Sequence, residues 1–100
     1  MNTHTLVLLT IISESLLKER LIHEIRKAGA KGFTISEVAG EGSRQRRVSE
    51  ILGDNIKIEV IAKQEIADEI LAVLQMHFFP SYAVIAYLSE VQVVREEKYI

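Results

Sequence analysis

Three arginines, two glycines and a serine lie close together in residues 40–47, where such residue types can bind an anion: Gly40, Gly42, Ser43, Arg44, Arg46 and Arg47. Arginine presents planar, forked N–H donors that match phosphate or carboxylate oxygens, and glycine lets the backbone expose its own N–H groups. A solvated hairpin connection has a similar composition. The residues alone therefore leave two interpretations open, an anion-binding loop and an idle connection.

The sequence gives less support to thiol chemistry, to a metal site or to a catalytic site. The absence of cysteine excludes disulfides, thiol catalysis and thiolate metal sites, and it fits a reducing cytosol. His4, His23 and His77 are far apart and lack metal-ligand spacing, so we interpret each as an ordinary side chain. No Ser–His–Asp set, paired carboxylates or base near the arginines is visible. We expect neither a metal site nor catalytic residues.

Bulk properties limit the partners. One hundred residues predict a single domain spanning residues 1–100. The net charge of -2 and the pI of about 5.9 argue against generic binding to nucleic acid or to an anionic membrane, so anion recognition must be local. The apolar run over residues 6–12 is far shorter than the roughly 20 residues of a membrane span, and no basic export signal precedes it. We expect a cytoplasmic protein without direct membrane insertion.

The first half of the chain predicts strand, helix and strand. A continuous aliphatic run predicts a central strand over residues 5–12. Leu17, Leu21 and Ile25 recur at helical spacing and predict an amphipathic helix, with Ser13 or Ser15 as its cap and glycines 29 and 32 ending it. Alternating apolar and polar residues over 33–38 then predict a strand with one solvated face.

A long connection follows, over residues 39–55. Ordinary hairpin connections need about 2–5 residues, so seventeen residues without a sustained apolar period are either functional or partly disordered. The arginines of the candidate anion site lie within this connection.

The second half repeats the alternation of strand and helix. Residues 56–62 predict a strand, residues 63–78 a helix that ends before Pro80, and residues 82–88 another strand. Residues 91–94 predict a separate short edge strand, and residues 95–100 a charged tail.

This order of elements predicts an α+β fold, the ferredoxin-like βαββαβ plan, with its long loop between strands 2 and 3. Both helices of that plan cover one face of an antiparallel sheet. Nearly half of the residues are apolar, which is high for a small domain, and apolar strand residues on the open face need cover. We expect a homo-oligomer.

Five segments resemble the PII family of trimeric signalling proteins, and most closely its SbtB-like branch, which is associated with bicarbonate uptake. They are spread over most of the chain, between residues 6 and 87: residues 6–10, 29–34, 40–47, 55–59 and 79–87. The sequence Ala-Lys-Gly-Phe-Thr together with Gly-x-Gly-Ser-Arg-x-x-Arg is the more specific part, because spacing and composition both agree.

The resemblance implies a homotrimer that binds adenine nucleotides in clefts between subunits. The loop over about residues 39–55, the T-loop of this family, would change its order on binding and regulate a protein target, such as a bicarbonate transporter at the membrane periphery. The nucleotide-binding residues would be Arg44 and Arg47 at phosphate, Gly40, Gly42 and Ser43 at the loop base, and Thr34, Ile35 and Ser36 near adenine or ribose.

Three departures from the family pattern narrow the ligand. The Gly-x-Gly-Lys nucleotide loop of many PII proteins is absent, and residues 80–84 stand in its place. Glu41 puts a carboxylate beside the predicted phosphate site and disfavours highly charged ligands. We therefore expect AMP, ADP or cyclic AMP rather than ATP, and no obligatory cofactor. The first strand–helix turn over residues 11–15 is also two residues longer than in relatives.

Three alternatives share parts of this pattern. An RNA-binding module has the same element order, but its stacking aromatics belong on the two central strands, where residues 5–12 and 56–62 have none. A phosphate-ester enzyme could use Arg44 and Arg47 but lacks a visible base. A metal-binding trimer of the CutA type would need histidines or cysteines at ligand spacing.

Overall fold

Four strands and two α-helices make up the residues that the structure, a computed structural model, describes, namely 2–40 and 54–100. Two short 3-10 turns complete the order: β1 (His4–Glu14), η1 (Ser15–Leu17), α1 (Lys18–Lys27), β2 (Thr34–Val38), β3 (Asn55–Ala62), α3 (Gln64–His77), β4 (Ile85–Val93) and η2 (Glu96–Lys98). The predicted α+β, ferredoxin-like βαββαβ plan is confirmed.

The strands form one antiparallel sheet in the order β2-β3-β1-β4. Strand β1 lies between two partners, since Leu9 pairs with Val60 of β3 on one side and with Leu88 of β4 on the other. Helices cover one face of β1, and apolar residues such as Leu8 and Ile12 also stand on its open face, so aliphatic residues occupy most of its positions. The continuous apolar run therefore predicted the central strand correctly.

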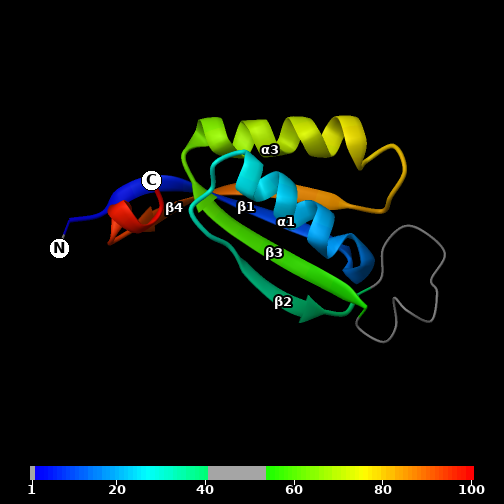
Figure 1. Ribbon diagram of the computed structural model, residues 1–100. Helices are drawn as coiled ribbons and strands as arrows, with labels where there is room; N and C mark the ends of the chain where they lie inside the picture. The colour runs from blue at the N-terminus through cyan, green and yellow to red at the C-terminus, as the bar shows by residue number, and fades with distance from the viewer. Residues whose placement is uncertain (1, 41–53) are drawn as a thin grey trace.

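The core lies between the sheet and one helix layer. Leu9 and Ile11 of β1 alternate onto the same face as Ile58 of β3, and all three are fully buried. The apolar stripes of the two helices pack on this face, with Leu21, Ile25, Ile70 and Leu74 almost completely buried in the same cluster. Figure 1 shows α1 and α3 running alongside each other over the strands.

The other sheet face carries no helix among the described residues. Its strand positions include Ile85, which is 56% exposed, and Tyr87, which is 52% exposed. Ile85 and Tyr87 belong to the edge strand β4 and pair with Ile12 and Thr10 of the central strand β1, so their exposed side chains lie on this face beside β1. The predicted open face is present, and its cover by other subunits stays a prediction.

Strand β4 corrects one expectation. A strand over residues 82–88 and a separate edge strand over 91–94 were expected, whereas β4 runs without a break over Ile85–Val93. The polar pair Ser89 and Glu90 continues the ladder opposite Leu8 and Val7 of β1. Because β4 is an edge strand, its polar side chains can face solvent without interrupting the backbone pairing.

The beginning of α1 corrects a second expectation. Ser13 and Ser15 do not cap the helix, because β1 extends to Glu14 and the turn η1 precedes α1, whose N-cap is Leu17 without a side-chain cap hydrogen bond. The Ser13 hydroxyl donates to the carbonyl oxygen of Glu14, 3.0 Å away. The Ser15 hydroxyl instead donates to the carbonyl oxygen of Asp54.

Several connections meet at one end of the sheet. The end of β1, the end of β2 and the start of β3 come together there, since Asn55 pairs with Glu14 on one side and Val38 on the other. The connection from α3 to β4 lies at the same end, opposite the two chain termini (Figure 1). The two described residues that flank the long connection, Gly40 and Asp54, therefore begin and end it at this edge.

Candidate functional site

The predicted site residues divide into those the structure describes and those it does not. Thr34, Ile35 and Ser36 lie in β2, and Gly40 follows its end by two residues. The remaining predicted residues lie outside the described part of the chain: Gly42, Ser43, Arg44 and Arg47. Their assignments stay predictions, and Arg46 is given no role in the site.

Strand β2 sends its predicted residues to two different faces. Thr34 pairs with Glu59 and Ser36 with Lys57, and these polar residues alternate onto the open face of the sheet. Ile35 pairs with Ile58 and packs, half-buried, against the core beneath the helices. The structure thus brings Thr34 and Ser36 together on the open face and places Ile35 on the opposite face.

A hollow of about 310 Å³ opens beside Thr34. Its size is at the lower end of the range for small-molecule sites, which is roughly 300–1,000 Å³. It combines apolar side chains, an aromatic ring and both signs of charge, from Leu8, Gly32, Phe33, Thr34, Glu59, Ile61, Lys98 and Tyr99. Such a lining can hold a flat, partly apolar group and hydrogen-bond its polar edge.

Gly40 leaves open space where the long connection begins. A Cβ atom added at this glycine would meet no heavy atom within 4 Å among the described residues. Its φ is not positive either, since Gly29 is the glycine with positive φ in the described part of the chain. Neither crowding nor backbone conformation among these residues requires glycine here.

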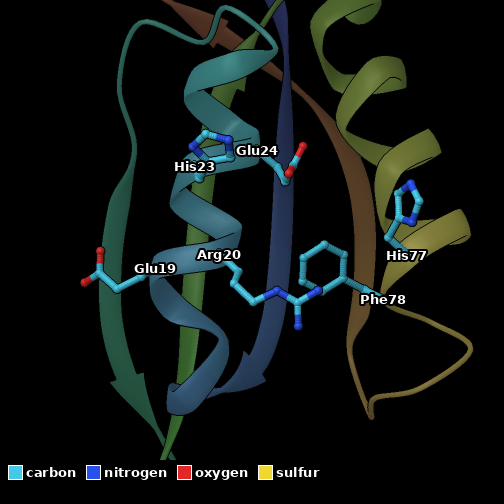
Figure 2. A pocket seen from close by; sticks show the side chains of 6 residues that line it. All are labelled: Glu19, Arg20, His23, Glu24, His77 and Phe78. Atoms are coloured by element: carbon cyan, nitrogen blue, oxygen red, sulfur yellow. The ribbon is translucent and has the colours of Figure 1, made fainter.

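A second hollow, of about 610 Å³, lies between α1 and α3 and was not predicted (Figure 2). Six residues line it: Glu19, Arg20, His23, Glu24, His77 and Phe78. In Figure 2, Arg20 reaches from α1 toward the ring of Phe78, Glu24 points toward α3, and Glu19 points away from it.

Arg20 is held in place by two aromatic rings. Its guanidinium carbon lies 4.8 Å from the ring centroid of Phe78 and 5.4 Å from that of Tyr82, within cation–π range. One guanidinium N–H group also donates to the Tyr82 hydroxyl at 3.0 Å. Phe78 is only 2% exposed, so Arg20 covers a core residue. These contacts fasten α1 to the connection after α3.

The second hollow offers little beyond this structural role. No group of three or more His, Cys, Asp or Glu side chains among residues 2–40 and 54–100 is arranged to hold a metal ion. His23 and His77 come from different helices and are both exposed, and neither has a described hydrogen-bonding partner that would orient it as an acid or base. The hollow beside Thr34 is therefore the better candidate site.

Sequence reasoning missed several residues of that hollow. Glu59 alternates with buried residues along β3, so a period of two could have placed it on the open face beside Thr34. Lys98 and Tyr99 gave no such signal, because only the folded chain brings the C-terminal turn back to β1 and β3.

Comparison with known proteins identifies close relatives. The family model described as nitrogen regulatory protein P-II matches residues 6–98. The structure of a PII-like signaling protein from Thermus thermophilus is 50% identical, covers 100% of both chains and has a TM-score of 0.86. CPII from Thiomonas intermedia, bound to ADP and bicarbonate, is 28% identical over 99% of this chain and 98% of its own, with a TM-score of 0.89.

A more distant structure shows the same fold. The ATP complex of GlnK from B. subtilis is 18% identical over 91% of this chain and 85% of its own, with a TM-score of 0.65.

None of the helices in the described part of the chain is long and apolar enough to cross a membrane.

Proposed function

Because the chain belongs to the nitrogen regulatory protein P-II family, we propose that it binds adenine nucleotides between the subunits of a homotrimer and thereby regulates a protein target. It is a PII-like signalling protein, and the nucleotide would act as its signal and not as a substrate. The T-loop over about residues 39–55 would carry the signal to the target.

The position of the hollow beside Thr34 carries the proposal. It lies on the open sheet face next to β2, the strand that leads to Gly40 and the predicted phosphate-binding residues. Thr34 and Val38 are four residues apart, which is about 13 Å along a strand. A nucleotide with its base in the hollow would extend along β2, past Ser36, and bring its phosphates toward the loop base. Arg44 and Arg47 would close over them from the loop.

Solved relatives support the choice of ligand. CPII, which is 27–28% identical to this chain, has been solved with ADP and bicarbonate and with ADP, AMP and bicarbonate. Glu41 adds a reason to favour AMP, ADP or cyclic AMP over ATP, because its carboxylate would repel additional phosphate charge. We propose no obligatory cofactor.

The open sheet face supports the trimer. Ile85 and Tyr87 of the edge strand β4 are more than half exposed on this face, and Leu8, Ile12 and Ile61 contribute further apolar area on the same face. Each Å² of apolar surface removed from water contributes about 25 cal/mol. Contact of these faces between subunits would bury that area and turn the hollow beside Thr34 into an intersubunit cleft.

The target is the least constrained part of the proposal. The resemblance to the SbtB-like branch suggests a membrane transporter for bicarbonate, which a cytoplasmic trimer would reach from the membrane periphery. The bicarbonate in the CPII structures is compatible with a link to inorganic carbon.

Calorimetry against AMP, ADP, ATP and cyclic AMP tests the nucleotide site. Wild-type protein should bind at least one of the first two, or cyclic AMP, at submillimolar concentration. Arg44→Ala should weaken binding by about tenfold or more, since a hydrogen bond to a charged group is worth roughly 1.5–3 kcal/mol. Arg46→Ala is the matched control and should bind like the wild type. If no nucleotide binds, or if Arg44→Ala binds unchanged, the assignment of this anion site is wrong.

A further inference from the structure

The C-terminal segment around η2 forms one side of the hollow that β1, β2 and β3 form on the other. Lys98 and Tyr99 are 64 and 65 residues away from Thr34 in the sequence, yet they line the same space. On the sheet side, Leu8 and Ile61 supply apolar surface.

Backbone and side-chain contacts hold this segment in a defined shape. The N–H of Lys98 donates to the carbonyl oxygen of Arg95 at 3.0 Å, and the N–H of Tyr99 donates to that of Glu96 at 2.9 Å. His4 at the start of β1 lies 3.5 Å from Glu96, from Nδ1 to Oε1, an ion pair when the imidazole is protonated. The turn therefore presents Tyr99 without further ordering, which lowers the entropic cost of a contact.

The ring and the hydroxyl of Tyr99 have no partner among the described residues. Its side chain is half-buried, but within residues 2–40 and 54–100 its ring contacts no other aromatic ring and its hydroxyl makes no hydrogen bond. Tyr82, by comparison, has Arg20 and Phe78 as partners. A flat heteroaromatic ring can therefore bind between the ring of Tyr99 and the apolar floor of the hollow.

We propose that Tyr99 stacks on the base of the bound nucleotide, holding it against Leu8 and Ile61. This inference rests on the proposed function, because it assigns a residue to the same site. Stacking on an aromatic side chain is worth roughly 1–3 kcal/mol per base and depends little on which base is present. Tyr99 therefore contributes affinity, while other contacts select adenine.

Three substitutions at this position separate the ring from the hydroxyl and from apolar bulk. Calorimetric titration with ADP should show that Tyr99→Phe binds within about twofold of the wild type, because the ring remains. Tyr99→Ala and Tyr99→Leu should each weaken binding about tenfold, the equivalent of about 1.4 kcal/mol, because they remove the π-face. Circular dichroism and the measured molar mass verify that each variant keeps the fold and assembly of the wild type.

Arg44→Ala, titrated in parallel, distinguishes failure of this inference from failure of the proposed function. If wild-type protein binds ADP and Arg44→Ala binds weakly, but Tyr99→Ala and Tyr99→Leu bind like the wild type, the stacking role is wrong and the nucleotide site stands. Equal losses in Tyr99→Phe and Tyr99→Ala would also contradict stacking, since they point to the hydroxyl. If the wild type binds none of ADP, AMP and cyclic AMP, both proposals fail together.

Discussion

Ser15 donates two hydrogen bonds to the same carbonyl oxygen, that of Asp54, from its backbone N–H at 2.7 Å and from its hydroxyl at 2.8 Å. Asp54 precedes β3 directly, and Ser15 begins the turn that leads into α1. The contact therefore ties the point where the long connection returns to the sheet to the first strand–helix turn. It continues the β1–β3 pairing, in which Glu14 lies opposite Asn55, by one position.

Ser15→Ala removes one of these two hydrogen bonds and keeps the other. We expect the free energy of unfolding to fall by about 0.5–1 kcal/mol, because the hydroxyl bond is exposed and water replaces part of it. Urea denaturation at fixed protein concentration measures this loss. Ser81→Ala is the control, since the Ser81 side chain has no hydrogen bond among the described residues. An effect no larger than that of Ser81→Ala would show that the hydroxyl contributes nothing.

Arg20→Ala should destabilise the protein by about 1.5–3 kcal/mol. The substitution removes two cation–π contacts and a hydrogen bond to Tyr82, each worth roughly 0.5–1 kcal/mol at an exposed site. Near-ultraviolet circular dichroism reports on the ring environment, and urea denaturation reports on stability.

Arg20→Lys and Tyr82→Phe resolve the parts of this contact. Lysine lacks the planar guanidinium and should recover only part of the stability, whereas Tyr82→Phe loses the hydrogen bond alone. A double-mutant cycle between Arg20→Ala and Tyr82→Phe should give a coupling energy of about 0.5 kcal/mol or more. Strict additivity would contradict a direct interaction between the two side chains.

Ile85→Asp should convert the proposed trimer to monomers. Ile85 pairs with Ile12 on the open face, and a charge there would remain buried and unpaired in the interface. Size-exclusion chromatography with light scattering gives the molar mass directly. Met76→Asp is the control, because Met76 is 71% exposed at the end of α3, away from this face, and should leave the trimer intact. A wild-type monomer, or a trimer in both variants, would rule out the open face as the interface.

Glu41→Gln should shift nucleotide preference toward ATP. Two unit charges 4 Å apart repel by about 1 kcal/mol in water, so removal of the carboxylate should improve ATP binding roughly fivefold and AMP binding less. The ratio of the two dissociation constants, measured by calorimetry at one ionic strength, tests this. An unchanged ratio would mean that Glu41 does not face the phosphates.

The sequence predicted the fold well because each element carried its own period. The aliphatic run of β1 and the alternation of β3 differ visibly from the helical spacing of Leu17, Leu21 and Ile25. The predicted ends of helices and strands were wrong where tertiary contacts outweigh local conformational preference. Ser15 has the chemistry of a helix cap, but Asp54, 39 residues away, accepts its hydrogen bond instead.

The candidate site was harder to predict than the fold. Thr34 and Ser36 could be placed together because residues two apart on a strand share a face. Tyr99 could not be placed in the hollow, because its position depends on where η2 lies after β4. The charged tail shows no apolar period from which that position could be inferred. The same limit applies to Arg20, whose aromatic partners lie about sixty residues further along the chain.

Native mass spectrometry of the protein mixed with ADP tests the central claim most directly, because one spectrum reports both assembly and ligand. We predict the mass of a trimer carrying one ADP per subunit, with Arg44→Ala giving a trimer of the same protein mass, apart from the substitution, and less bound ADP. A monomer, or a trimer that binds none of ADP, AMP and cyclic AMP when each is mixed with it at concentrations approaching millimolar, would contradict a nucleotide site between subunits.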